Sequence, residues 1–445
     1  MPVPARRRWR PNPARIAQDL PARPARGVTA GTIGAVPLQV WTALFVLAGC
    51  SSEPASAAPP EPAPEPASVA PPEPAPPAPS PAPTREVTIA ASGDLVLNPH
   101  AMRAIADDGD DGYTNLLAGY AASLDDASIA FLNLEQPLVN DVVDLDPGWP
   151  RQDPSRPRRS PILGATPPLA DALAAAGVDV VSVANNHAYD QEREGLRRTL
   201  AQLARVSVVA VGGGPDADAA YAPAVIEREG VRVAFVAFTG FFNQHPGGET
   251  VAVAARLEEE RVAASLASAR EVADVVVASV HWSRDFAERA RASERRHARR
   301  LVAQGADVIL GTGPHVLHSV ERLESARGEA VVAYSLGNVA SGMGRTYRVG
   351  RPPRGFIHPA NVTPEARDAV VLRIGLRVTE TIEITSLTAE ALWTENNWLA
   401  HRTEDAPHRV SVIRLADAEP ALRAERVARI ADALGDAVAL TPEPE

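Results

Sequence analysis

Short hydrophobic runs, each followed by a polar turn, recur along the chain from Glu86 onward. A segment with apolar residues at helical spacing often comes next, and this order of strand, turn and helix is typical of a layered α/β domain. The runs predict strands at 87–92, 128–132, 178–183, 206–211, 274–280, 307–310 and 331–335, and helices at 116–124, 168–176, 194–203, 257–271, 293–304 and 420–434. Alternating patterns add antiparallel strands at 224–229, 231–238, 369–376 and 381–387. Residues 86–445 are therefore predicted to form one α/β domain.

The first 49 residues have the pattern of a secretion signal. Residues 33–49 form an apolar segment that has about the length of a signal-peptide core and is short for a membrane span. The segment ends in Leu47-Ala48-Gly49-Cys50, which resembles the lipobox of bacterial lipoproteins, whose cysteine is acylated after cleavage before it. Residues 1–49 are therefore interpreted as a lipoprotein signal peptide and Cys50 as the lipidated residue. The alternative is a chance tetrapeptide behind a membrane anchor.

Residues 50–85 predict a disordered linker. Fourteen of the 42 prolines lie in residues 51–84, among alanine and glutamate, and such a sequence cannot bury enough apolar surface to fold. An extended spacer of this kind reaches at most roughly 100 Å, at ~3.1 Å per residue. We expect it to hold residues 86–445 away from a membrane of the cell envelope, on the extracytoplasmic side. The absence of aspartate directly after Cys50 resembles the sorting rule for the outer membrane in cells that have two membranes.

Composition excludes several classes of site. The net charge of −11 argues against nucleic acid as the main partner, because phosphate binding needs a basic face. All 44 basic residues are arginines, which removes any P-loop, kinase or Schiff-base lysine. Cys50 is the only cysteine, so the chain has no internal disulfide and no thiolate cluster. A metal ion would have to be held by His, Asp, Glu and Asn.

Side chains that can bind metal ions follow five of the predicted strands. They are Asp94, Glu135, Asn186 with His187, His281, and His315. Parallel strands bring their carboxyl ends to one edge of a sheet, so we expect these side chains to meet there. Nitrogen and oxygen ligands without sulfur suit Mn, Fe, Zn or Mg. One or two such divalent ions could bind, and two ions that share a carboxylate could clamp a phosphoryl oxygen and activate a water molecule.

Each of these residues also has a simpler explanation. A Gly-Asp pair after a strand is a common turn, and residues 183–190 could form a polar turn with a helix N-cap. The remaining histidines, apart from His318, are interpreted as hydrogen-bonded rather than metal-bound: His100, His245, His297, His358, His401 and His408.

The order of motifs is similar to that of a known family. The motifs are Gly93-Asp94, Asn133-Leu134-Glu135, Ala184-Asn185-Asn186-His187 with Asp190, His281-Trp282, Pro314-His315-Val316 and Ser335-Leu336-Gly337-Asn338. Together they resemble the bacterial capsule-synthesis protein CapA family, also called poly-γ-glutamate synthesis proteins, which belongs with the calcineurin-like metallophosphoesterases. The resemblance covers about residues 86–340. It implies a four-layer α-β-β-α sandwich with a two-metal site between the sheets.

The resemblance also implies a role for each matching residue. Asp94 and His315 would hold the first metal ion, Glu135 would bridge both ions, and Asn186 and His281 would hold the second. His187 would be the general acid that protonates the leaving oxygen, and Asp190 would orient it. An asparagine ligand leaves the adjacent histidine free for proton transfer. Asn338 is assigned to substrate binding.

The chain departs from the family pattern at four positions. Gly313 stands where the family usually has the first histidine of His-Pro-His, so the second ion would lose a ligand, and His318 is a candidate substitute. Glu192 stands where the family usually has glycine. Ser283 and Asp285 replace the usual Gly and Glu after His281-Trp282.

A predicted loop at 140–160 carries a second candidate site for an anionic substrate. Its arginines could bind phosphate or polyglutamate carboxylates through bidentate contacts, or could simply be solvated. They are Arg151, Arg156, Arg158 and Arg159.

Three functions fit these observations. The first is a membrane-anchored, metal-dependent phosphoesterase that acts in capsule or poly-γ-glutamate metabolism. The second is a non-catalytic lipoprotein that binds an anionic polymer or a capsule-synthase complex during export, which the loss of a ligand at Gly313 favours. The third is hydrolysis or transfer at an amide of polyglutamate, with metal ions polarising the carbonyl.

Overall fold

The computed structural model describes residues 84–139, 162–245, 251–348, 359–404 and 406–442. The predicted signal peptide, Cys50 and residues 51–83 of the predicted linker lie outside these ranges, as does the whole of the predicted loop at 140–160. The last residue of the predicted linker, Arg85, is the first residue of a strand, because it pairs with Val378. The account below concerns the unit that extends from Pro83 to the C-terminus.

Most strands belong to one large mixed sheet of 15 strands. The strands are β1 (Arg85–Val96), β2 (Ile129–Leu134), β3 (Val180–Ser182), β4 (Val209–Val211), β6 (Ala224–Arg228), β7 (Val231–Thr239), β9 (Val275–His281), β10 (Val308–Thr312), β11 (Val320–Ser325), β12 (Gly328–Ala333), β13 (Asn338–Ser341), β14 (Asp368–Val378), β15 (Ile382–Asn396), β16 (Val410–Arg414) and β17 (Ala439–Thr441). The main path runs β4-β3-β2-β1-β14-β15-β12-β10-β9-β7-β6. Two short strands, β5 (Gly213–Gly214) and β8 (Val253–Ala254), pair separately.

The sheet folds over so that its two halves face one another. The first half contains β4, β3, β2, β1, β14 and β15, and the second contains β12, β10, β9, β7 and β6. The halves are joined along the path where β12 pairs with β15, in register only at Gly328 and Ile382. Between them lies a core of Val, Ile, Leu and Phe side chains from both halves, in which Phe131 of β2 stacks on Phe235 of β7 at 6.1 Å between ring centroids.

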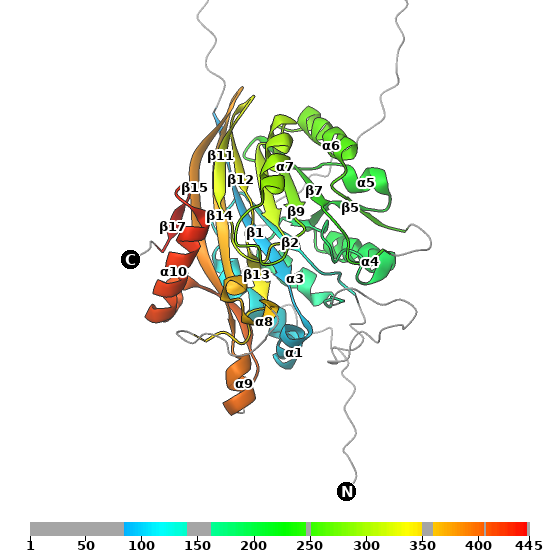
Figure 1. Cartoon of the computed structure of the whole chain (residues 1–445). Coiled ribbons are helices and arrows are strands. Elements are labelled where there is room, and N and C mark those ends of the chain that lie inside the picture. The colour runs from blue at the N-terminus through cyan, green and yellow to red at the C-terminus, as the bar shows by residue number, and fades with distance from the viewer. Residues whose placement is uncertain (1–83, 140–161, 246–250, 349–358, 405, 443–445) are drawn as a thin grey trace, which may run out of the picture. The chain divides into compact units, whose positions relative to one another are not determined.

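Most of the helices cover the outer faces of both halves, as Figure 1 shows, whereas the last helix packs against the core between them through Val427, Ile430 and Leu434. The helices are α1 (Pro99–Asp107), α2 (Gly112–Ala122), α3 (Pro168–Ala175), α4 (Glu192–Arg205), α5 (Ala217–Tyr221), α6 (Glu259–Val272), α7 (Ala292–Ala303), α8 (Pro359–Val362), α9 (Trp398–Glu404) and α10 (Pro420–Leu434). One outer core joins α1–α4 to the first half, and another joins α5–α7 to the second half. Three apolar cores therefore separate four layers, α-β-β-α, and the predicted layered α/β fold is confirmed.

Most predicted elements are present, with shifted ends. The predicted helix at 420–434 matches α10, and the hairpin at Gly230 joins β6 to β7. Asp94 was predicted to follow a strand but lies inside β1, because β1 continues past a bulge to pair with β13. Strand β4 starts at Val209 instead of Val206, because α4 runs to Arg205 and Ser207 turns the backbone with a φ of 60°.

The C-terminal helix α10 is attached to the sheet by a buried ion pair. Arg426 on α10 is 1% exposed, and its Nε donates to Asp368 Oδ1 at 2.9 Å while its Nη2 bonds to Oδ2 of the same carboxylate. The guanidinium group lies 5.3 Å from the centroid of the Trp393 ring. In the described part of the chain, no helix is both long and apolar enough to cross a membrane.

Candidate metal centre

Three of the predicted ligands meet in one buried pocket. Asp94 lies in β1, Glu135 directly follows β2, and His315 follows β10, so the pocket is built from both halves of the sheet. Each residue offers one ligand atom, and these atoms all lie within 4.8 Å of one another. The side chains are at most 3% exposed. This is the convergence at a strand edge that the sequence predicts for these three residues.

His281, the last residue of β9, adds a fourth potential ligand to the pocket. Its Nε2 lies 3.4 Å from Glu135 Oε1, and its Nδ1 lies 3.9 Å from Asp94 Oδ1. The same Nδ1 lies 3.0 Å from the Thr312 hydroxyl, which fixes the ring orientation. Glu135 therefore lies between two imidazoles, as a bridging carboxylate would.

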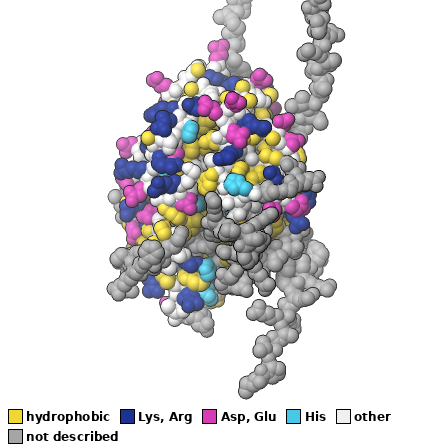
Figure 2. Space-filling model, turned by 45° about the vertical axis from the view of Figure 1, so that its right-hand side comes forward, with side chains coloured by type: hydrophobic (Ala, Val, Ile, Leu, Met, Phe, Trp, Pro, Cys, Tyr) yellow, Lys and Arg dark blue, Asp and Glu magenta, His cyan; other side chains and the backbone are white. Residues whose placement is uncertain are grey.

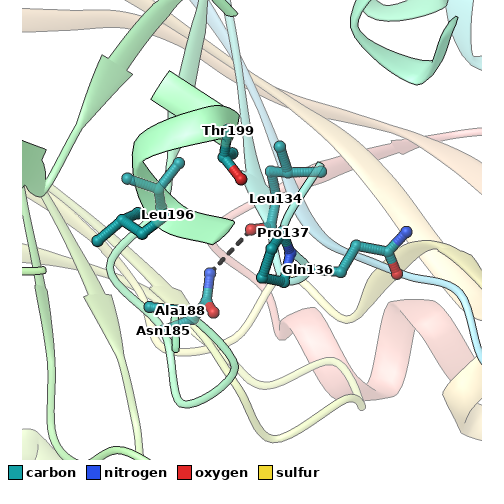
Figure 3. Close-up of a pocket in the computed structure, with 8 residues that line it drawn as sticks. Leu134, Gln136, Pro137, Asn185, Ala188, Leu196 and Thr199 are labelled. Atoms are coloured by element: carbon teal, nitrogen blue, oxygen red, sulfur yellow. Dashed lines mark hydrogen bonds between the residues drawn. The ribbon is translucent and has the colours of Figure 1, made fainter. Parts of the chain in front are cut away.

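Asn186 lies in the turn between β3 and α4. Its main-chain oxygen accepts a hydrogen bond from the Asn243 amide at 2.9 Å. Its side-chain Oδ1 is buried and has no hydrogen-bond donor. The neighbouring Asn185 has a different role, because its Nδ2 donates to Leu134 O at 2.8 Å and ties the turn to β2 (Figure 3).

The polar atoms of the pocket fit a bound cation. Both carboxylate oxygens of Glu135 are buried without a hydrogen-bond donor, although His281 and His315 lie 3.4 and 3.6 Å away. A buried carboxylate without donors is costly, and a bound cation would satisfy both oxygens. The donor set of carboxylates and imidazoles suits hard or borderline divalent ions.

The electrostatics of the pocket also favour a positive charge between its carboxylates. Burial raises the pKa of Glu135 well above its usual value, and the nearby Asp94 carboxylate adds to this, although His315 opposes it. Burial also acts to raise the pKa of Asp94, but hydrogen bonding to His315 and the histidine charges outweigh burial and lower it. Burial opposes protonation of His315, yet Glu135 and Asp94 raise its pKa to about 10. Burial lowers the pKa of His281 to about 3, although Asp94 opposes this.

His187 and Asp190 form a hydrogen-bonded pair beside the pocket. His187 Nδ1 lies 2.6 Å from Asp190 Oδ2, which also accepts the Leu163 amide at 2.6 Å. His187 Nε2 lies 3.4 Å from Asn243 Nδ2. A carboxylate on Nδ1 fixes the ring and its tautomer, and leaves Nε2 as the nitrogen that can exchange a proton.

Asn133, the first residue of the Asn133-Leu134-Glu135 motif, positions Asp94. Its Nδ2 donates to Asp94 Oδ1 at 2.7 Å and lies 3.4 Å from His281 Nδ1. Asn133 and Glu135 are two residues apart, so side-chain alternation along β2 directs both to the same face. That spacing is the signal by which the residue could have been found.

Gly313 occupies a position that a histidine side chain cannot take in this backbone. Its φ is +100°, and a Cβ built on it would lie 2.7 Å from Trp282 O and 3.1 Å from His281 Nε2. The Gly313 amide instead donates to Asp94 Oδ2 at 3.0 Å. His318, the candidate substitute, has its Nε2 2.6 Å from Ala287 O.

Glu192 also has an unusual backbone conformation. Its φ is 60°, in the left-handed region, which explains why glycine is the usual residue in the family at this place. The remaining substrate candidates on the 140–160 loop, Arg151, Arg156, Arg158 and Arg159, lie outside the described residues.

Asn338 contacts a proposed ligand. His315 Nδ1 lies 3.0 Å from Asn338 Oδ1, and Asn338 Nδ2 donates to Ala366 O at 2.8 Å. Asn338 is fully buried in β13, and its amide orients the His315 ring through the same Nδ1 that lies 3.3 Å from Asp94 Oδ2.

We therefore expect the Asn338→Ala variant to bind a divalent ion about 10–100-fold more weakly, the usual effect of losing a group that orients a metal ligand. Competition with a chelator of known affinity, using the full-length protein and Mn²⁺, would measure this. The exposed Asn115, bonded to Asp108, supplies a control in the Asn115→Ala variant. Equal affinities in the wild type and in Asn338→Ala would refute the orienting role.

A small cavity lies next to the turn that carries Asn186. Its lining includes Leu134, Gln136, Pro137, Asn185 and Thr199, and its volume of about 10 Å³ is near that needed for one water molecule (Figure 3). It is too small for a substrate, so it does not serve as the binding site.

Comparisons with known proteins identify the family. Residues 88–343, more than half of the chain, match the family model described as bacterial capsule synthesis protein PGA_cap. The PGA biosynthesis protein CapA of Bacillus subtilis (strain 168) is 30% identical over 169 residues, 38% of this chain and 43% of that protein. The capsule biosynthesis protein CapA of Bacillus anthracis is 24% identical over 268 residues, 59% of this chain and 61% of that protein. The chain thus spans less than two thirds of either relative.

Two solved structures show a limited likeness. A novel phosphatase from Mycoplasma pneumoniae has a TM-score of 0.38 at 12% identity, over 69% of this chain and 93% of that one. The NAD nucleotidase of Haemophilus influenzae also has a TM-score of 0.38, at 10% identity, over 81% of this chain and 58% of that one. The sequence match decides the assignment: the chain belongs to the bacterial capsule synthesis protein family PGA_cap, as the order of its motifs predicts.

Proposed function

We propose that this protein is a metal-dependent hydrolase of the phosphoesterase type that acts in the synthesis or export of an anionic cell-envelope polymer. The observation that carries the proposal is the placement of Glu135. Its two oxygens lack hydrogen-bond donors, and they lie among Asp94, His281 and His315, beside the His187–Asp190 pair. The names of the relatives, which refer to capsule and PGA biosynthesis, support the polymer context.

Asp94, Glu135 and His315 would hold a divalent ion, and Asn186 and His281 would complete the site. When bound, such an ion supplies Lewis acidity, which draws electron density from a phosphoryl oxygen. Asn133 and the Gly313 amide hold the two oxygens of Asp94 in place. Burial of the whole set keeps bulk solvent away from the ligands, which strengthens electrostatic interactions with a substrate phosphate.

His187 would manage the proton of the leaving group. Because Asp190 occupies Nδ1, the protonated ring presents Nε2–H to a leaving oxygen, and Asp190 stabilises the positive charge of the imidazolium. In the neutral ring Nε2 is a hydrogen-bond acceptor, and the side-chain nitrogen Nδ2 of Asn243 lies 3.4 Å from it.

A non-catalytic role in polymer binding or synthase assembly is the second candidate function. The observation that favours it is Gly313, whose conformation excludes the histidine usual in the family and removes one ligand from the second ion. In that case the pocket would hold an ion for structural reasons only.

Metal removal separates the two functions. We expect the full-length protein to contain one or two divalent ions and to hydrolyse a simple phosphodiester with Mn²⁺. Chelation followed by dialysis should abolish hydrolysis, and added Mn²⁺ should restore it. Bound metal without hydrolysis of phosphodiester or polyglutamate, together with retained polymer binding, would support the accessory role. If the protein hydrolyses polyglutamate but not the phosphodiester, the reaction would be cleavage of an amide bond.

A further inference from the structure

A second cluster of unusual side chains surrounds Trp398 at the start of α9. We call it the Trp398 cluster; its members are Trp398, His100, His401, His408, Arg345 and Arg402. The His100 ring lies 4.5 Å from the Trp398 ring, and the His401 and His408 rings stack at 5.2 Å. The Arg345 and Arg402 guanidinium groups lie over Trp398 at 5.2 and 5.7 Å from its centroid. Elements far apart in the sequence therefore bring arginine, histidine and indole together.

The cluster has an excess of positive charge, although the chain as a whole is acidic. In the described part of the chain, no salt bridge joins Arg345 or Arg402 to a carboxylate, whereas Arg373 and Arg377 on the sheet are paired. Burial lowers the pKa of His100 to about 4, and the charges of Arg345 and Arg103 contribute to this. Burial also lowers the pKa of Arg345. Among the described residues, the Arg345 and Arg402 guanidinium groups thus lie together without a salt-bridge partner, and Asp107 is the carboxylate that acts on His408, where it opposes the lowering of the pKa by burial.

Two hydrogen-bond donors at the Trp398 cluster have no acceptor. They are Arg345 Nε and Nδ2 of Asn396, which lies two residues before Trp398, and both are buried. His100 Nδ1 is also buried without a partner, and in the neutral ring it donates in only one of the two tautomers. The Asn396 side chain is held in place, because its Oδ1 accepts the Trp398 amide at 3.0 Å and lies 3.3 Å from His408 Nε2. Unsatisfied donors of this kind need an acceptor atom, and an oxyanion satisfies several donors at once.

The Trp398 cluster adjoins the elements that build the candidate metal centre. Asn98, four residues after Asp94, caps α1 through His100 N and donates to Gly342 O at 2.9 Å. Gly342 follows β13, which carries Asn338, and Arg345 lies three residues further on. In Figure 2 the end of the molecule where α9 lies shows histidine, arginine and hydrophobic side chains side by side. The Trp398 cluster therefore lies next to the carboxyl ends of β1 and β13, the strands that carry Asp94 and Asn338.

We propose that the Trp398 cluster is a binding site for an oxyanion, either a carboxylate of an acidic polymer or a phosphate. The guanidinium groups of Arg345 and Arg402 would supply charge-assisted hydrogen bonds, and their contacts with the Trp398 ring would hold both groups in place. A metal ion is not the expected occupant, because no described group of three ligands forms here, as one does at Asp94, Glu135 and His315.

Calorimetric titration of the full-length protein would test the site. The test rests on the proposed function only in its choice of probe. The protein is first stripped of metal and dialysed, so that the candidate metal centre contributes nothing. The probes are γ-linked tetraglutamate, the same peptide with its carboxylates amidated, and inorganic phosphate. Trp398 fluorescence provides a second signal, compared with a Trp398→Phe variant.

Matched variants assign any binding to the cluster. We expect Arg345→Gln and Arg402→Gln each to weaken oxyanion binding at least about tenfold, as the loss of a hydrogen bond between charged groups does. Arg402 is exposed, so its variant tests the site even if Arg345→Gln folds poorly. Arg300→Gln on α7, which removes an exposed arginine paired with Glu259, is the control and should bind within about twofold of wild type.

Each outcome of the titration either supports or overturns the proposal. Binding of tetraglutamate but not of its amidated form, weakened in both variants, supports the proposal with a carboxylate as the ligand. Binding of phosphate alone, weakened in the same variants, supports it with phosphate as the ligand. Absence of binding to both anions, equal binding of the amidated peptide, or wild-type affinity in both variants overturns it. None of these results depends on whether the protein hydrolyses a substrate.

Discussion

The His187→Ala variant is expected to turn over a phosphodiester about 10²–10⁴-fold more slowly than the wild type while keeping its metal content, since this is the usual contribution of general acid catalysis. The reason is geometric. Asp190 lies 2.6 Å from Nδ1 and leaves Nε2 as the nitrogen able to protonate a leaving oxygen, and the side chain is only 7% exposed. Steady-state turnover and metal analysis of the same preparation would measure the two quantities.

The choice of substrate makes this test specific to proton transfer. Leaving groups of low pKa depart without protonation, so the ratio of wild-type to variant rates should fall for nitrophenyl esters and rise for alkyl esters. His297→Ala, which changes an exposed histidine on α7, is the matched control. A ratio that does not vary with the leaving group, or metal lost together with activity, would exclude His187 as the proton donor.

Asp368→Ala is expected to reduce the free energy of unfolding by about 3–5 kcal/mol, because it leaves the Arg426 guanidinium buried without its main partner. Arg426 is 1% exposed, and Asp368 accepts from both its Nε and its Nη2. Glu425 and Glu365 lie 3.2 and 3.7 Å from Arg426, so they compensate in part and favour the lower end of this range. Urea denaturation followed by circular dichroism would give the value.

A double variant distinguishes the lost ion pair from lost packing. Asp368→Leu with Arg426→Met removes both charges and keeps much of the apolar volume, so it should be more stable than Asp368→Ala alone. Glu383→Ala, which removes an exposed partner of Arg377, should change stability by less than about 1 kcal/mol. If Asp368→Ala reduced the free energy of unfolding by less than about 1 kcal/mol, the Asp368–Arg426 pair would not anchor α10.

The sequence predicts those elements whose pattern is strong and local. Helix α10 has helical spacing, begins at Pro420 and ends before Gly435, whose φ is +77°, and its predicted bounds match the structure. Helix α1 was missed although Asn98 and Pro99 are typical start signals, because its apolar face is short. Strand β13 has only four residues, and it exists because Gly93 lets the Gly337 carbonyl approach β1 closely.

The sequence predicts the ligands of the candidate site but not the hydrogen bonds that orient them. Glu135, His281 and His315 could be recognised because each follows or ends a strand, and parallel strands must bring such positions together. Asp94 could be recognised because it follows the apolar run at 87–92, although β1 continues past it. The hydrogen bonds that orient these ligands could not be predicted, since Asn133 and Asn338 look like ordinary strand residues until their partners are known. The three histidines around Trp398 were each interpreted singly, and only the tertiary structure shows them as a group.

The folded-over sheet has a thermodynamic consequence. Asp94 and Glu135 come from one half, His281 and His315 from the other, and the main path joins the halves at a single registered residue pair. An ion held by all four residues would link the two halves of the sheet. Binding of the ion and folding of the sandwich would therefore stabilise each other. At an ion concentration one hundred times the dissociation constant, this linkage adds about 2.7 kcal/mol to the free energy of unfolding. The supply of metal in the compartment where the protein works would then set its lifetime as well as its activity.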